Sequence, residues 1–389
     1  MLRPRPVLTR RVLAALDASA SHVPVLLGGS GSGRTVLLQH LRDRIGRTAV
    51  HLVDVERTAT TPERFLRALT ATSPFPRLDA AADDARSAFD ATLAFFDRAR
   101  TSGGGPATFF LDEFLELRTF ESFPGLRRAL PELLQTLSAS GNRFVLTSRY
   151  VARSLRLLKD TSARFEVIHM PALTIEETID ILAAPGGPRP PGGTPQDAES
   201  LAQTIHALAD GHPAYVRAVA DELVAMGGQG GSDAMSALVG LMAPGGRLAT
   251  VCAFCYELRL HRARGYGALK AILEILAEDE DLTLTEVSQR LRRTPGSTKD
   301  YLSWLEDVDL VTARHKRYSF TDPLLRVWVR LYCRVAAPAE DEVAREIHRY
   351  AMPRLPQVEP THALATADAP ESLAAAGEDK KAWGIIEID

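Results

Sequence analysis

The chain has 389 residues, of which 45% are hydrophobic and 24% charged, and its formal net charge at pH 7 is −3. A chain of this length has enough apolar residues for about two or three domains, each with its own core. The acidic balance excludes a protein that coats nucleic acid with its whole surface, although it leaves room for one locally basic module.

The three cysteines, Cys252, Cys255 and Cys333, are too few and too irregularly spaced for a disulfide framework, which indicates a reducing compartment. The basic N-terminus "MLRPRPVLTRRVLAAL" lacks the apolar core and cleavage site of a signal peptide. No apolar run approaches the roughly 20 residues that span a bilayer. We therefore expect a cytoplasmic protein without a membrane partner.

Residues 1–170 alternate short apolar runs with longer segments of helical periodicity. The runs predicted as strands cover residues 23–28, 50–55, 107–113, 143–149 and 164–170. Their apolar positions are continuous, which is typical of strands buried on both faces. The pattern predicts an α/β domain with a parallel sheet and helices on both faces.

After Met170 the predicted strands stop, and residues 171–250 read as amphipathic helices that form a small all-α lid domain. Residues 251–337 contain three helices followed by two short β runs around "ARHKRY", the pattern of a winged helix-turn-helix domain. Residues 338–389 are predicted as one amphipathic helix and a poorly ordered tail, whose end "AWGIIEID" also alternates enough for an edge strand.

The stretch "LLGGSGSGRTVLL" has the composition of a loop that binds phosphate. Its glycines permit unusual backbone angles, and the helix that begins near Arg34 directs free N–H groups toward an anion. The candidate phosphate ligands are Gly28, Gly29, Ser30, Gly31, Ser32, Gly33, Arg34, Thr35 and Val36. The hydroxyl of Thr35 is in position to ligate magnesium. A glycine-rich turn without a ligand remains the alternative.

Two further strands end in polar residues. "TFFLDE" ends in Asp112 and Glu113, and "FVLTSR" ends in Arg149. Ligands of parallel sheets bind at this carboxyl edge. Asp112 would hold the magnesium through water, Glu113 would polarise the attacking water, and Arg149 would detect a phosphate. The alternative for the two acids is a solvated pair at a strand end.

The motifs occur in the order "GGSGSGRT", "FFLDE", "LTSR", "MPALTIEET", "GHP" and "FTDPLLRVWVRLY". Over about Val7 to Tyr332 this order resembles the signal-transducing STAND ATPases of the AAA+-related P-loop group, and most of all the archaeal-type ATPases. Origin-recognition ATPases share much of the layout. The resemblance implies an ATP-driven switch that uses Mg²⁺, with Gly33, Arg34 and Thr35 on phosphates and magnesium, Asp112 and Glu113 in the Walker B role, Arg149 as phosphate sensor, and Pro213 beside the adenine.

Arg34 occupies the position where such loops carry lysine. Lysine is a compact point charge that follows the phosphates through the reaction, whereas arginine is longer and geometrically stiffer. We expect nucleotide binding to tolerate this replacement more readily than hydrolysis does, so the sequence leaves ATPase activity open. The alternative to an ATPase is a nucleotide-binding interaction protein with little catalysis.

The predicted winged helix is locally basic, with ten Lys or Arg against six Asp or Glu in residues 286–334. Its candidate DNA contacts are Arg292, Arg293, Lys299, Arg314, Lys316 and Arg317. The predicted recognition helix also carries acidic residues, which argue against DNA binding because acids that face a duplex reduce affinity. They are Asp300, Glu306 and Asp307. Two interpretations stay open: double-stranded DNA binding, or an inhibitory domain that faces protein. The partners considered are thus ATP or ADP, DNA, and a protein or further copies of the chain.

Overall fold

The computed structural model describes residues 5–18, 22–76, 82–159, 161, 163–188, 194–227, 231–261 and 265–355. These residues belong to one compact unit, Met1–Pro356. The tail predicted after the last helix, including "AWGIIEID", lies outside the described residues.

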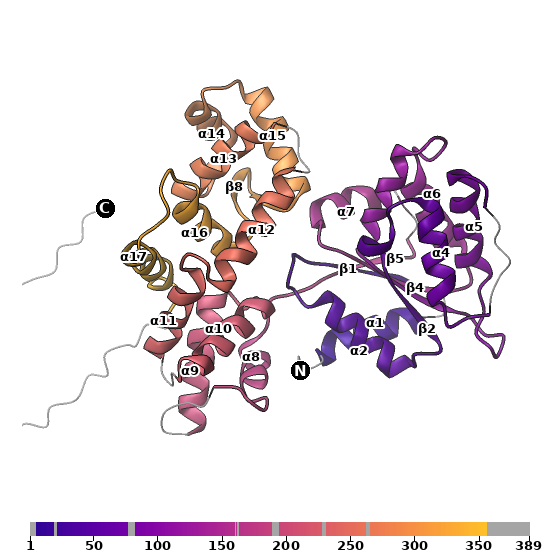
Figure 1. Ribbon diagram of the computed structural model, residues 1–389, viewed down its shortest axis with the longest axis horizontal. Coiled ribbons are helices and arrows are strands. Elements are labelled where there is room, and N and C mark those ends of the chain that lie inside the picture. Colours follow the sequence, from indigo (N-terminus) through magenta and orange to yellow (C-terminus); the bar gives the residue numbers. More distant parts are fainter. Residues whose placement is uncertain are drawn as a thin grey trace, which may run out of the picture. The chain divides into compact units, whose positions relative to one another are not determined.

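The first part of this unit is built on a five-stranded sheet in the order β2-β3-β4-β1-β5 (Figure 1). All pairings are parallel, and the strands are β1 (Val23–Leu27), β2 (Val50–Asp54), β3 (Thr108–Asp112), β4 (Arg143–Ser148) and β5 (Phe165–His169). Each of the five predicted strands is present within a residue or two of its expected ends. Every residue of β1 and β3 is buried, which agrees with their continuous apolar sequences.

Helices cover both faces of this sheet, as predicted. Leu26 and Phe110 point to one face, where they pack with α1 (Pro6–Asp17) and α2 (Arg34–Ile45). Alternate strand residues point to the other face, whose core includes side chains of α4 (Pro62–Thr72), α5 (Ala85–Arg98), the 3₁₀ helix η1 (Phe114–Ser122) and α6 (Ala129–Ala139). The remaining elements of this part are the short α3 (Val55–Thr58) and α7 (Val151–Leu158).

The helices that follow the sheet are α8 (Ile175–Leu182), α9 (Pro195–Ala209), α10 (Pro213–Ala225), α11 (Gly231–Met242) and α12 (Arg247–His261). Threonine side chains cap the starts of α8 and α9 in capping boxes, which explains why the helices begin there. The predicted domain boundary at residue 250 falls inside α12. Because one apolar cluster also continues from α8 to α17, the boundary stays a prediction.

The last elements include the expected helices and β-ribbon, together with a short strand, β6, that was not predicted. They are α13 (Tyr266–Glu278), β6 (Leu282–Thr283), α14 (Leu284–Leu291), α15 (Pro295–Asp307), β7 (Val311–Arg314), β8 (Arg317–Phe320), α16 (Pro323–Tyr332) and α17 (Glu340–Ala351). The three strands form an antiparallel sheet in the order β6-β8-β7. His315 and Lys316 turn between β7 and β8 with φ of 51° and 64°, the left-handed geometry that suits a two-residue hairpin.

No single helix of the described ranges has the length and hydropathy to cross a membrane, although α11 and α12 pass such a test as a pair bent by 45°.

Candidate functional site

The glycine-rich loop joins β1 to α2 at the carboxyl edge of the sheet. In the sheet β1 lies between β4 and β5, neither of which is next to it in the sequence. Gly31 and Gly33 have φ of +78° and +90°. A Cβ on Gly31 would lie 2.7 Å from Cε1 of His212 and 2.8 Å from Cβ of Ala214, so only glycine fits there. Gly33 is the N-cap of α2, and no side chain caps the helix. The N–H groups at this helix start are therefore suited to an anion.

Thr35 and Asp112, the two predicted magnesium ligands, lie together. Thr35 Oγ1 donates to Asp112 Oδ2 at 2.8 Å, and Thr147 Oγ1 donates to Asp112 Oδ1 at 2.5 Å. Thr147 accepts in turn from the backbone N–H of Glu113 at 3.1 Å, which fixes the end of β3 against β4. A hydroxyl and a carboxylate are oxygen donors of the kind that Mg²⁺ prefers, so the residues fit the predicted ion.

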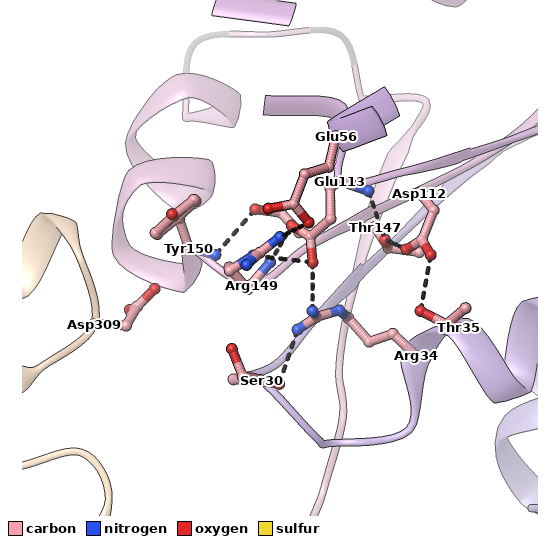
Figure 2. Close-up of polar contacts among 12 residues, drawn as sticks. Ser30, Arg34, Thr35, Glu56, Asp112, Glu113, Thr147, Arg149, Tyr150 and Asp309 are labelled. Carbon is pink, nitrogen blue, oxygen red and sulfur yellow. Dashed lines mark hydrogen bonds and ion pairs between the residues drawn. The ribbon is translucent and has the colours of Figure 1, made fainter. Parts of the chain in front are cut away.

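Glu113 follows Asp112 with a left-handed backbone, φ 59° and ψ 48°, which directs its side chain into the site. Its carboxylate is held by two arginines (Figure 2). Arg34 Nη2 donates to Oε1 at 2.5 Å, and the backbone N–H of Arg149 donates to Oε2 at 3.0 Å. The side-chain Nε of Arg149 lies 3.3 Å from Oε1.

Arg34 is 7% exposed and turns back across the site instead of pointing along the loop. Its Nη1 donates to the carbonyl oxygen of Gly29 at 2.9 Å, while Nη2 pairs with Glu113. Burial lowers the pKa of Arg34, and the carboxylates of Glu113 and Asp112 oppose that effect. The sequence predicted phosphates as the partners of Arg34; in the structure its partners are the carbonyl oxygen of Gly29 and the carboxylate of Glu113.

Arg149 lies at the predicted edge, directly after β4. Besides Glu113, it forms an ion pair with Glu56 of α3. Burial by itself lowers the pKa of Arg149, but the two carboxylates outweigh burial and raise it. Arg149 is therefore a fixed cation beside Glu113.

His212, which precedes the predicted adenine neighbour Pro213, contacts the loop. Its Nε2 lies 2.9 Å from the carbonyl oxygen of Ser30. A carbonyl only accepts, so Nε2 carries the proton. Burial lowers the pKa of His212, which keeps the ring neutral. The resemblance implied only that Pro213 lies beside the adenine, and the contact of His212 with the loop was not predicted.

A cavity of about 450 Å³ opens beside the loop, within the size range of about 300–1,000 Å³ that is typical of small-molecule sites. Its apolar walls include Met170, Pro171 and Val251, and Pro213 lines it as expected for an adenine neighbour. The polar or charged side chains on its walls include Ser30, Ser32, Asp210, His212, Arg259, Asp309, Arg314 and Asp322.

Arg259 and Asp309 are among the wall residues that were not identified from the sequence. Arg259 of α12 is 8% exposed and donates from Nη1 to the carbonyl oxygen of Asp309 at 3.0 Å. Its Nη2 lies 3.4 Å from Ser30 Oγ. The carboxylate of Asp309 accepts from the backbone N–H groups of Val151 at 2.6 Å and Ala152 at 3.3 Å, at the start of α7. Neither residue belongs to a motif, so no sequence signal pointed to them.

The candidate DNA contacts fall in two places. Arg292, Arg293 and Lys299 are exposed on α15 and the turn that precedes it, and Lys316 and Arg317 are exposed at the β7–β8 hairpin. Arg314 belongs to β7 but lines the cavity beside the glycine-rich loop. Arg314 is also exposed and is the register partner of Arg317, so it belongs to the same hairpin group as Lys316 and Arg317.

No protein-family model matches the chain, and no curated protein sequence matches it. Among solved structures, the Walker-type ATPase PABY2304 of Pyrococcus abyssi is similar, with a TM-score of 0.62 and 17% identity over 85% of this chain and 99% of that chain. The Orc1 protein of Aeropyrum pernix in complex with DNA has a TM-score of 0.44 and 15% identity, over 89% and 93% of the two chains. Cdc6p of Pyrobaculum aerophilum has a TM-score of 0.40 and 13% identity, over 92% and 96%. The sheet, its helices and the first of these similarities establish that the chain has the fold of Walker-type, or P-loop, ATPases.

Proposed function

We propose that this protein binds ATP with Mg²⁺ at the glycine-rich loop and acts as a nucleotide-dependent switch of the AAA+-related STAND type. The observation that carries the proposal is the hydrogen bond between Thr35 and Asp112, at 2.8 Å, beside a loop whose two left-handed glycines open into an uncapped helix. The hydrogen bond brings together a hydroxyl and a carboxylate 77 positions apart in the sequence, which supports the proposed magnesium site.

In this proposal the backbone N–H groups from Gly31 to Thr35 hold the phosphates, and Thr35 and Asp112 hold the magnesium. The bound ion would supply Lewis-acid stabilisation of negative charge on the phosphates. The cavity wall formed by Met170–Ala172 and Pro213 would hold the nucleoside. Glu113 would accept a proton from the attacking water, and Arg149 would stabilise its position.

Hydrolysis would be slow, because Glu113 is a poor proton acceptor while Arg34 holds its carboxylate. The guanidinium of Arg34 has to move away from Glu113 before Oε1 of Glu113 can accept a proton from water. Removing one partner from a buried ion pair costs about 3–5 kcal/mol, and each 1.4 kcal/mol is a factor of ten in rate. We therefore propose a switch that spends long periods in its ATP-bound form.

We further propose that the helices α13–α15 and the β6–β8 sheet are the winged helix of the switch and bind double-stranded DNA. Exposed basic residues around the turn before α15 and the β7–β8 hairpin support DNA binding. They are Arg292, Arg293, Lys299, Lys316 and Arg317. These side chains can meet phosphates without using the acidic residues of α15.

One observation favours a second candidate, in which the winged helix inhibits by facing protein. The residue Asp309, just after α15, accepts hydrogen bonds from Val151 and Ala152 at the start of α7. A docked winged helix of this kind would restrain the nucleotide site without any DNA.

The test of nucleotide binding is calorimetric titration with ATP and Mg²⁺ together with a phosphate-release assay. We expect Thr35→Ala and Asp112→Asn to weaken magnesium-dependent binding about tenfold or more. Thr204→Ala is the matched control, because the hydroxyl of Thr204 donates to the carbonyl oxygen of Ser200 within α9, away from the loop. Equal affinity of all four proteins for Mg-ATP would refute the proposed site.

A further inference from the structure

Arg259 connects α12 to the glycine-rich loop. Its guanidinium bridges the carbonyl oxygen of Asp309, at 3.0 Å, and the hydroxyl of Ser30, at 3.4 Å. All three residues line the cavity beside the loop.

These partners satisfy a buried guanidinium poorly. Both are uncharged, and the contact with Ser30 is longer than the usual 2.9–3.0 Å of an N–H···O bond. Within the described ranges Arg259 forms no ion pair with a carboxylate. Buried cations normally have an anionic partner, because an unpaired charge is costly to remove from water. The position of Arg259 therefore suits an anion that arrives at the loop.

Asp309 links the same arginine to the opposite wall of the site. Its backbone is left-handed, with φ 53°, and ends α15 through bonds from its own N–H and that of Leu310. This turn places its carbonyl on Arg259 and its carboxylate on the first N–H groups of α7. The helix α7 begins two residues after Arg149, whose backbone N–H donates to Glu113. The contacts through Arg259 and Asp309 therefore connect the loop to the segment that holds Glu113.

We propose that Arg259 binds a phosphate of the nucleotide held at the loop and, through Asp309, couples phosphate binding to the contact of the α15–β7 turn with α7. This inference rests on the proposed nucleotide site. A phosphate oxygen is a stronger partner for the guanidinium than the hydroxyl of Ser30, since both groups are charged. As Arg259 turns toward the phosphate, its bond to the Asp309 carbonyl weakens. Adenosine, which carries no phosphate, leaves the arrangement unchanged.

The first test compares the affinities of ATP, ADP and adenosine for the full chain by calorimetry. In Arg259→Met the apolar stem is kept and the charge is lost. We expect about tenfold to hundredfold weaker binding of ATP and ADP and unchanged binding of adenosine, with partial recovery in Arg259→Lys. Arg345→Met is the control, because Arg345 is 71% exposed and pairs with Asp341 on its own helix, α17.

Unchanged adenosine binding also shows that Arg259→Met is folded. Wild-type affinity for ATP and ADP in that variant overturns the inference while the proposed function stands. If the unmodified chain binds neither nucleotide, the proposed function fails and the inference fails with it.

The second test follows amide exchange of Val151 and Ala152 by hydrogen–deuterium exchange. ATP should change the protection of both amides in the wild type and leave it unchanged in Arg259→Met. In Asp309→Gly both amides should exchange at least tenfold faster whether or not ATP is present. Glycine accommodates φ 53° and keeps the carbonyl that Arg259 contacts, so the variant removes only the carboxylate. Equal protection of both amides with and without ATP in the wild type would overturn the coupling.

Discussion

Arg34 and Glu113 form a buried ion pair in which Nη2 lies 2.5 Å from Oε1 and the side chains are 7% and 9% exposed. The same guanidinium donates to the carbonyl of Gly29, so one planar group holds both the loop and the glutamate at the end of β3. Arginine can make both contacts because its nitrogen donors form a rigid fork. The departure from lysine in this loop thus has a structural consequence at the residue expected to activate water.

Arg34→Lys is expected to raise the rate of ATP hydrolysis by about tenfold while changing nucleotide affinity by less than about threefold. A lysine ammonium lacks the forked donors of arginine and cannot contact Gly29 and Glu113 in the same way. The carboxylate of Glu113 therefore loses about one charged hydrogen bond and becomes free to contact water. The measurement is steady-state phosphate release under saturating Mg-ATP.

Arg34→Met serves as the companion variant, because it removes the charge and should weaken ATP binding itself. A lysine variant with lower turnover than the wild type would contradict this account, and would show that arginine takes part directly in catalysis.

Glu113→Gln is expected to reduce turnover by about a hundredfold or more, which is the typical contribution of a general base. The amide oxygen still accepts from the backbone of Arg149, so ATP affinity should stay within a few fold. Phosphate release and calorimetry on the same preparation check both statements. If turnover and the response to ATP are both unchanged, Glu113 has no catalytic role and the enzyme proposal fails.

The extent to which the sequence predicted this site follows from how its residues are brought together. Thr35 and Asp112 were predictable, because each stands at the carboxyl end of a strand and parallel strands bring those ends to one edge. The contacts of His212 and Arg259 with Ser30 were not, since they join residues 182 and 229 positions apart through helices that belong to no motif with the loop. The pairing of Arg34 with Glu113 depends on side-chain direction, which spacing does not encode.

Replacing both Arg292 and Arg293 with alanine is expected to weaken binding to any DNA duplex and to reduce the dependence of affinity on salt. The slope of log K against log salt falls by about 0.9 for each phosphate that the protein no longer neutralises. Titrations by fluorescence anisotropy at several salt concentrations give that slope, with Arg345→Ala as the exposed-arginine control. Failure of the wild type to bind duplex DNA at low salt would eliminate the DNA proposal and leave the protein-facing one.

Because His51 is buried, we expect the free energy of unfolding to decrease in acid. His51 is 3% exposed on β2 and lies near Phe75 and Phe109. Burial lowers its pKa from 6.5 to about 4. The unfolded chain therefore binds a proton more readily, so His51 costs no stability above pH 6.5 and destabilises the fold as pH falls toward 4.

Between pH 7 and pH 5 this effect amounts to about 2 kcal/mol of unfolding free energy. Urea denaturation of the wild type and His51→Phe at both pH values isolates it, since phenylalanine does not titrate. The wild type should lose more stability than the variant on acidification. Parallel losses in the two proteins would mean that His51 reaches water in the folded state.

The contribution of Asp309 to the free energy of unfolding should depend on pH in the opposite direction. Burial raises its pKa from 3.8 to about 6, although hydrogen bonds from Ala152 and Val151 and the charges of Arg259 and Arg34 act against the rise. The folded carboxyl thus binds a proton more readily than the unfolded one. Its contribution to stability is complete below pH 3.8 and is lost as pH rises through about 6.

From pH 5 to pH 7 the loss is about 1 kcal/mol. Asp309→Asn keeps an acceptor for the α7 amides and tolerates the left-handed backbone, but it does not titrate. The stability of the wild type relative to this variant should therefore fall between pH 5 and pH 7, measured by urea denaturation. The protection of Val151 and Ala152, after correction for intrinsic exchange, should fall over the same interval in the wild type alone. A stability difference that is constant with pH would place the carboxylate of Asp309 in contact with solvent, away from α7.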